Sequence, residues 1–149
     1  MVVAIIGDGS LAEGLALEAL NHASAEKDLK LMIIINDNGF AISPGFGAIH
    51  NNLQSSQNYS NPNNFLLPLG YEVYGPINGH IISDIISKIE LAKSSSKIPI
   101  IHLKTIKGNG LDIADKHQYR MHFSFPFNKN QKEIQESKNN NIEQFNNYQ

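Results

Sequence analysis

The stretch Val2-Val-Ala-Ile-Ile-Gly-Asp-Gly-Ser10 decides the fold. Its five apolar residues, most of them β-branched, are typical of a strand that is buried on both faces. Gly7 and Gly9 then allow a tight turn and a close approach of the backbone to another group. Apolar residues follow at helical spacing, which predicts a helix over residues 10–25 with Ser10 as its N-cap and Glu13, three residues on, as its partner in a capping box. A strand, a glycine turn and the start of a helix together form a common binding site for phosphate groups.

Asp8 is the unusual residue of this turn, because its carboxylate would repel a phosphate unless a cation lay between them. A second buried-strand pattern, over residues 30–36, runs into the polar sequence Asn36-Asp-Asn38. If the two strands are parallel neighbours, their carboxyl ends lie side by side, and Asp8 converges with Asn36 or Asn38. One carboxylate, one amide oxygen, one backbone carbonyl and two phosphate oxygens would suit the octahedral shell of Mg²⁺.

The remaining pattern predicts an α/β domain with a mostly parallel sheet flanked by helices. The predicted strands cover residues 2–6, 30–36, 71–74 and 97–104, and the predicted helices cover residues 10–25 and 81–93. The predicted turns and loops cover residues 51–64, 75–80 and 107–110. His102 lies in a predicted strand and is expected in the core. Residues 130–149 are polar and are expected to be disordered or weakly helical.

The composition excludes several classes of protein. The 149 residues are 41% hydrophobic, which suits one domain with a packed core. The net charge of −2, without a basic stripe, argues against a nucleic-acid partner. The absence of cysteine excludes disulfides, thiolate metal sites and a cysteine nucleophile. No apolar run is long enough to cross a membrane, and no signal or transit peptide is visible, so no membrane partner is expected.

The order of the motifs resembles that of the 1-deoxy-D-xylulose-5-phosphate synthases, which are transketolase-like thiamine diphosphate enzymes. The matching blocks are Gly7-Asp-Gly-Ser10, Glu18-Ala-Leu-Asn21, Ile35-Asn-Asp-Asn38, Ile42-Ser-Pro44, Gly47-Ala-Ile49, Gly75-Pro-Ile-Asn-Gly-His80, Lys107-Gly-Asn-Gly110 and Met121-His-Phe123. The resemblance implies an incomplete thiamine-diphosphate-binding domain over residues 1–128. It leaves residues 129–149 as a polar tail.

The resemblance also implies how the cofactor and its metal would be held. Asp8 would give a carboxylate ligand to Mg²⁺, Asn38 would give an amide oxygen, and Phe40 would give its backbone carbonyl. From the residues alone, Asn36 stays open as an alternative to Asn38.

Further residues would lie around the cofactor. The backbone of Gly7, Gly9 and Ser10 would meet the diphosphate. Lys107 lies in the glycine turn that the family places near the cofactor. His122 matches a histidine near the reacting centre, where it would relay protons or hold substrate.

The complete enzyme that the resemblance implies is a transferase and a homodimer. It joins pyruvate to glyceraldehyde 3-phosphate with loss of CO₂, for isoprenoid and thiamine biosynthesis. The family's second domain carries a glutamate that activates the cofactor, and Leu111 stands here in place of a cofactor-contacting tyrosine. We therefore expect this chain to be inactive, or nearly so, without a partner that carries the missing domains. The expected compartment is the bacterial cytoplasm or the plastid.

Two other functions fit parts of the sequence. Gly7-Asp-Gly-Ser-Leu-Ala12 also matches the dinucleotide pattern G-x-G-x-x-A, and Asp37 ends the next strand, where an acid could bind the ribose of NAD. Such a dinucleotide site needs no metal, whereas thiamine diphosphate is bound through Mg²⁺. The third function is that of a non-catalytic remnant or interaction module, which Leu111 favours.

Overall fold

A computed structural model describes residues 1–26, 28–55 and 64–110 of the chain. Contacts divide the chain into two compact units, Met1–Thr105 and Ile106–Gln149. All described helices and strands lie in the first unit. The second unit is described only over residues 106–110, where the expected turn is present. Over the described ranges, no helix combines the length and the apolar character needed to span a membrane.

Several predictions concern residues outside these ranges. They are the role of His122, the substitution at Leu111, the domain boundary at residue 128, the tail over residues 129–149 and the loop over residues 56–63.

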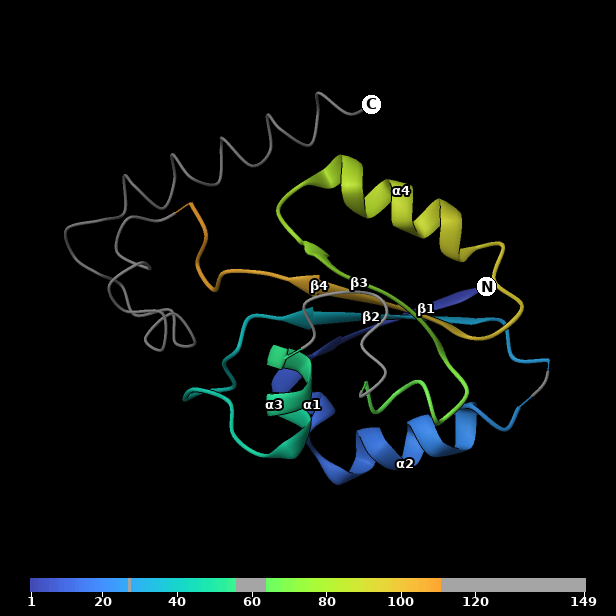
Figure 1. Ribbon diagram of the computed structural model, residues 1–149, viewed down its shortest axis with the longest axis horizontal. Helices are drawn as coiled ribbons and strands as arrows, with labels where there is room; N and C mark the ends of the chain where they lie inside the picture. The colour runs from blue at the N-terminus through green and yellow to red at the C-terminus, as the bar shows by residue number, and fades with distance from the viewer. Residues whose placement is uncertain (27, 56–63, 111–149) are drawn as a thin grey trace. The chain divides into compact units, whose positions relative to one another are not determined.

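The first unit is built on a parallel sheet (Figure 1). Its strands are β1 (Val2–Gly7), β2 (Leu31–Asp37), β3 (Glu72–Asn78) and β4 (Pro99–Lys104), in the order β1-β2-β4-β3. All three strand pairings are parallel, so the predicted α/β class is confirmed. Gly7 lies opposite Asn36, and Asp37 lies opposite Lys104. The carboxyl ends of β1, β2 and β4 therefore meet at one edge of the sheet.

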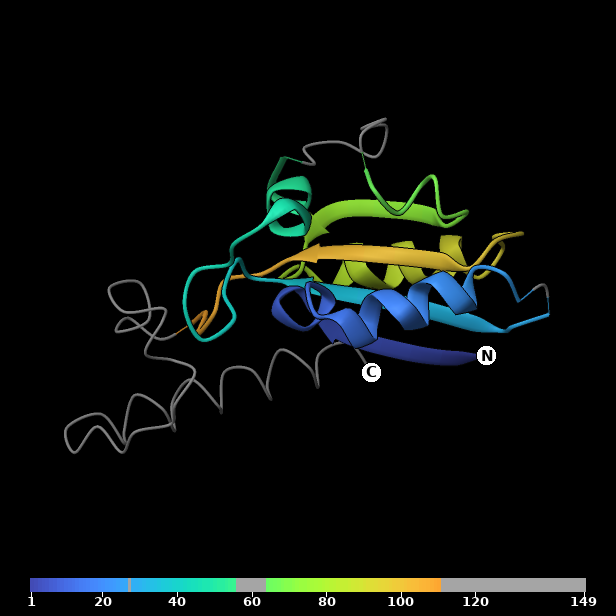
Figure 2. The same ribbon diagram turned by 90° about the horizontal axis from the view of Figure 1, so that it is seen from below.

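Helices cover both faces of this sheet. They are α1 (Asp8–Leu11), α2 (Gly14–Ala23), α3 (Ala48–Ser55) and α4 (Ile82–Ala92). The first three lie on one face and α4 lies on the other (Figure 1). In the view turned by 90°, α2 lies in front of the sheet and runs roughly along the strands (Figure 2). This arrangement explains why β2 is apolar at nearly every position, since a central strand needs apolar residues on both faces.

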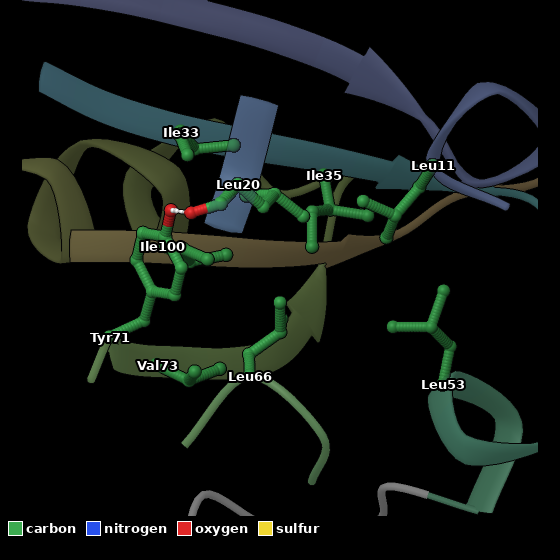
Figure 3. Close-up of a cluster of buried hydrophobic side chains, with 9 residues drawn as sticks. All are labelled: Leu11, Leu20, Ile33, Ile35, Leu53, Leu66, Tyr71, Val73 and Ile100. Carbon is green, nitrogen blue, oxygen red and sulfur yellow. Dashed lines mark hydrogen bonds between the residues drawn. The ribbon is translucent and has the colours of Figure 1, made fainter. Parts of the chain in front are cut away.

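Two hydrophobic clusters fill the space between the sheet and the helices. The cluster under α1, α2 and α3 consists of Leu11, Leu20, Ile33, Ile35, Leu53, Leu66, Tyr71, Val73 and Ile100 (Figure 3). The cluster under α4 consists of Met32, Ile34, Ala92, Ile101 and Leu103. Alternate residues of β2 and β4 enter alternate clusters, as the two-residue period of a strand requires. The Tyr71 hydroxyl donates a hydrogen bond of 2.7 Å to the Leu20 carbonyl at the end of α2 (Figure 3).

The prediction that the first strand is buried on both faces is wrong. β1 is present, but Val2 is 68% exposed and Ile5 is 73% exposed. Its position explains this, because β1 is an edge strand that pairs only with β2 among the described strands. Apolar composition therefore indicated the strand correctly and its burial incorrectly.

The single helix predicted over residues 10–25 is also wrong. The chain forms a short α1 with Gly7 as its N-cap, and Ser10 lies inside this turn instead of capping a longer helix. Glu13 has an extended backbone, with φ −85° and ψ 152°, and is the N-cap of α2. The expected capping box between Ser10 and Glu13 therefore does not form.

Two segments predicted as irregular contain regular structure. Residues 75–78 continue β3 beyond its predicted end, with an irregularity in its pairing to β4 between Tyr74 and Ile77. The start of the predicted polar loop is helix α3, which buries Leu53 under otherwise polar residues. Only Ile49 and Leu53 of α3 pack against the cluster, and two apolar residues were too weak a sequence signal to predict a helix.

Candidate functional site

The carboxyl edge of the sheet brings the two predicted motifs together. Asp8 follows β1 and Asn38 follows β2, and the Asn38 N–H donates to Asp8 Oδ1 at 3.4 Å. Asp8 is only 5% exposed although it follows an exposed strand. The parallel register of β1 and β2 causes this approach, because it places the last residue of β1 beside Asn36. The structure thus brings Asp8 next to Asn38.

The turn after β2 is compact. Asn38 Oδ1 accepts a hydrogen bond of 3.0 Å from the Phe40 N–H, and Phe40 forms an isolated β-bridge with Pro44. Gly39 has a φ of +76°, a conformation that favours glycine. An amide oxygen has two lone pairs, so the bond from Phe40 leaves Asn38 Oδ1 able to bind a cation.

Gly9 lies against this same turn. A Cβ atom built on Gly9 would be 2.8 Å from the Cβ of Ala41 and 3.1 Å from its Cα. Glycine is therefore required here by the close approach of the two loops. This agrees with the close backbone approach that the sequence predicted for Gly9, and identifies the neighbour as residue 41. Gly7 and Ser10 lie on either side of Asp8 and Gly9 in the same segment.

The structure separates Asn36 from Asn38. The Thr105 hydroxyl donates a hydrogen bond of 2.7 Å to Asn36 Oδ1, which ties Asn36 to the end of β4. Asn38, and not Asn36, donates its backbone N–H to Asp8. The geometry therefore favours Asn38 as the partner of Asp8.

Sequence reasoning missed a buried network around Asp37, which is 1% exposed. Asp37 Oδ2 accepts hydrogen bonds from His102 Nε2 at 2.7 Å and from Lys104 Nζ at 2.5 Å. Asp37 Oδ1 accepts from the Gly39 N–H at 3.1 Å and from Gln54 Nε2 at 3.0 Å. The period of β4 held a signal for this network, since residues 102 and 104 share one face of the strand. The expected burial of His102 is correct, but its ring pairs with a carboxylate.

The pKa values of the two carboxylates, Asp37 and Asp8, are shifted in opposite directions. Burial raises the pKa of Asp37, but hydrogen bonds from His102 and Lys104, together with their charges, outweigh burial and hold that pKa at about 2. Burial raises the pKa of Asp8, as does the negative charge of Asp37, while backbone N–H groups such as that of Asn38 oppose the rise. Asp37 thus stays ionised, and its negative charge is balanced by His102 and Lys104. A cation beside Asp8 would relieve the cost of burying its charge.

The donor set fits a hard cation that shares its shell with a phosphate ligand. Over the described ranges, no group of three or more His, Cys, Asp or Glu residues could hold a metal. Asp8, Asn38 and the Phe40 carbonyl offer only oxygen atoms, which Mg²⁺ prefers, and leave other positions to ligand oxygens. The helix start expected to attract phosphate is only the four residues of α1. Attraction of a diphosphate would therefore depend on the cation more than on a helix dipole.

Two other expected site residues stay predictions. Lys107 lies in the second unit. His122 lies outside the described residues.

Comparison with known proteins finds relatives of one family over much of the chain. A family model described as 1-deoxy-D-xylulose-5-phosphate synthase matches residues 1–66. The 1-deoxy-D-xylulose-5-phosphate synthase of Rippkaea orientalis is 34% identical over 85% of this chain, and that of Listeria monocytogenes is 40% identical over 76%. The chain spans 26% and 20% of these two relatives, about a quarter of their length or less.

Solved transketolase structures share the fold. The transketolase of Campylobacter jejuni superposes with a TM-score of 0.62 and 28% identity, over 78% of this chain and 17% of that one. The transketolase of Leishmania mexicana superposes with a TM-score of 0.57 and 24% identity, over 74% of this chain and 16% of that one, and supports the fold alone. By sequence and by fold, the chain is related to part of the 1-deoxy-D-xylulose-5-phosphate synthases and shares the transketolase-like α/β architecture.

Proposed function

We propose that this chain binds thiamine diphosphate through Mg²⁺, as part of a transketolase-type 1-deoxy-D-xylulose-5-phosphate synthase. The observation that carries the proposal is the contact between Asp8 and the Asn38 N–H at 3.4 Å. It joins two motifs that are 30 residues apart in sequence at the carboxyl edge of a parallel sheet. Ligands commonly bind at this edge in open α/β sheets.

Three groups of the chain would hold the metal. The Asp8 carboxylate would supply the negative charge, Asn38 Oδ1 a neutral oxygen, and the Phe40 carbonyl a third. The backbone at Gly9, which packs against the turn at Ala41, would also lie against the diphosphate. When bound, thiamine diphosphate supplies an electron sink for the carbon atom that loses its carboxylate.

The reaction of the complete enzyme is the finer part of the proposal. The substrates would be pyruvate and glyceraldehyde 3-phosphate, and the products 1-deoxy-D-xylulose 5-phosphate and CO₂. Since the chain spans about a quarter of its relatives, turnover would require a partner that supplies the remaining domains, in a homodimer or a split enzyme. His122 and Lys107 are proposed to contact substrate or cofactor in that assembly. The proposed compartment is the bacterial cytoplasm or the plastid.

The geometry disfavours the NAD alternative. That function needs the Asp37 carboxylate to accept hydrogen bonds from a ribose. Asp37 instead points into the protein and is engaged by His102 and Lys104. The dinucleotide interpretation therefore loses the acidic residue on which it depended.

Thermal unfolding of the full chain tests the proposal. The chain is heated with thiamine diphosphate, with and without Mg²⁺, and with NAD in parallel. At one hundred times its dissociation constant, a ligand stabilises by about 2.7 kcal/mol. In a domain of about 100 residues, such as the first unit Met1–Thr105, that raises the melting temperature by roughly 10 °C or more.

Three variants test which residues the Mg²⁺-dependent shift requires. Asp8→Ala and Asn38→Ala should each abolish the Mg²⁺-dependent shift, while Asn36→Ala should keep it, because Asn36 is bonded to Thr105 and not to Asp8. A shift without Mg²⁺, a shift that survives Asp8→Ala, or a shift with NAD alone would contradict the proposal.

A further inference from the structure

The candidate metal-binding turn begins directly after a buried carboxylate that no step of the proposed function uses. Asp37 is the last residue of β2, and Asn38 to Phe40 follow it. Its side chain is fully buried and accepts four hydrogen bonds. Burying a charge is costly unless it is paired, so a residue with this many donors is strongly fixed in place.

The donors come from three different parts of the fold. His102 and Lys104 lie on β4, Gln54 lies on α3, and Gly39 lies within the turn itself. Gln54 also accepts a hydrogen bond of 2.9 Å from Lys104 Nζ, which closes the network between α3 and β4. The carboxylate of Asp37 is therefore the point at which β4, α3 and the turn are joined.

The backbone of the same residue is held as well. The Thr105 N–H donates a hydrogen bond of 2.8 Å to the Asp37 carbonyl. With the bond from the Gly39 N–H to Asp37 Oδ1, the peptide groups on both sides of Asn38 are fixed. The remaining freedom of Asn38 is that of its side chain, which Phe40 already holds.

We propose that Asp37 is a positioning residue, which acts through the Gly39 N–H to hold Asn38 and Phe40 in the arrangement that receives the metal. This inference rests on the proposed function, because it assigns a purpose to a rigid turn only if the turn supplies metal ligands. Groups that orient the ligands of a metal commonly change its affinity by about 10–100-fold when they are altered.

The test compares Asp37→Asn with the wild-type full chain by two measurements. The first is hydrogen exchange of the Gly39 and Phe40 amides without any ligand. The second is the affinity for Mn²⁺, as a paramagnetic substitute for Mg²⁺, in the presence of thiamine diphosphate. We expect exchange at both amides to become at least about tenfold faster and the Mn²⁺ affinity to fall by about tenfold or more.

Glu72→Gln is the matched control. Glu72 is the first residue of β3, so it lies at the end of the sheet opposite to the carboxyl ends of the strands. It accepts a hydrogen bond of 2.5 Å from the Ser95 hydroxyl. Like Asp37→Asn, the Glu72→Gln variant replaces a hydrogen-bonded carboxylate with an amide. It therefore controls for a general effect of this exchange on the stability of the fold. Exchange at Gly39 and Phe40, and the Mn²⁺ affinity, should stay at the wild-type values in this control.

The outcomes distinguish a failure of the proposed function from a failure of the positioning role of Asp37. If the wild-type chain binds no Mn²⁺ with thiamine diphosphate, the proposed function fails and this inference fails with it. If the wild-type chain binds and Asp37→Asn binds equally well, or exchanges equally slowly at Gly39 and Phe40, this inference alone is overturned.

A milder variant covers the case in which Asp37→Asn does not fold. Lys104 has a side chain that is 33% exposed, so Lys104→Met removes one donor without leaving a cavity. It should move both measurements in the same direction and by less, because His102, Gln54 and Gly39 remain bonded to Asp37. Unchanged values in a folded Lys104→Met chain would also overturn the inference.

Discussion

Gly9→Ala is the substitution whose effect follows most directly from the geometry of the site. The new methyl group would lie 2.8 Å from the Cβ of Ala41 and 3.1 Å from its Cα, whereas ordinary carbon contacts lie at about 3.5–4.0 Å. Neither neighbour is the flexible end of a long side chain. The segment that carries Asp8 and the turn that carries Phe40 must therefore move apart by several tenths of an ångström.

The expected cost is about 1–3 kcal/mol of unfolding free energy, which is typical of an extra methyl group in a packed region. In a domain of about 100 residues, each kcal/mol lowers the melting temperature by roughly 4–8 °C. The separation should also weaken the 3.4 Å contact between Asn38 and Asp8, and with it the Mg²⁺-dependent stabilisation by thiamine diphosphate.

Gly14→Ala is the matched control. A Cβ at Gly14 meets no atom within 4 Å, and residue 14 begins α2. Alanine should be tolerated or should stabilise the helix by up to about 1 kcal/mol. Urea unfolding, followed by circular dichroism, measures both variants. If Gly9→Ala were as stable as the wild type and kept its ligand response, the close approach of the two loops would be refuted.

Two further predictions concern stability. Tyr71→Phe should cost about 1 kcal/mol in urea unfolding, because it removes one buried hydrogen bond while the Leu20 carbonyl keeps the Ser24 N–H; a loss above about 3 kcal/mol would contradict this. The pKa of Asp37 is about 2 in the folded chain, against an ordinary value of 3.8. The charged carboxylate therefore stabilises the fold fully above pH 3.8, and this stabilisation is lost as the pH falls through about 2. Across that interval the wild type should lose about 2 kcal/mol more than Asp37→Asn, and parallel pH curves of unfolding for the two chains would contradict this.

The sequence predicted the central part of the fold well. The short, β-branched apolar runs of β2 and β4 are typical of strands covered on both faces, and both strands are present. The run of β1 has the same composition, yet it lies at an edge. Composition reports that a segment is apolar, whereas its place in the sheet depends on strand order, which local patterns do not contain.

The candidate site shows the same division. The approach of Asp8 to the polar residues after β2 could be predicted from the sequence, because parallel neighbouring strands bring their carboxyl ends together. The network of Asp37 could not be assembled in this way, since His102 and Lys104 lie more than 60 residues further along the chain. Only the order β2-β4, with β3 outside, places these residues beside Asp37.

The strand order also has a consequence for synthesis of the chain on the ribosome. Among the described strands, β4 is the last to be made, yet it lies between β2 and β3. Until residue 104 has left the exit tunnel, β3 has no neighbour, and the Ile33 and Ile35 face of β2 lacks Ile100 beside it. The nascent chain therefore exposes apolar strands for longer than a sheet assembled in sequence order would, and such surfaces are those that chaperones bind.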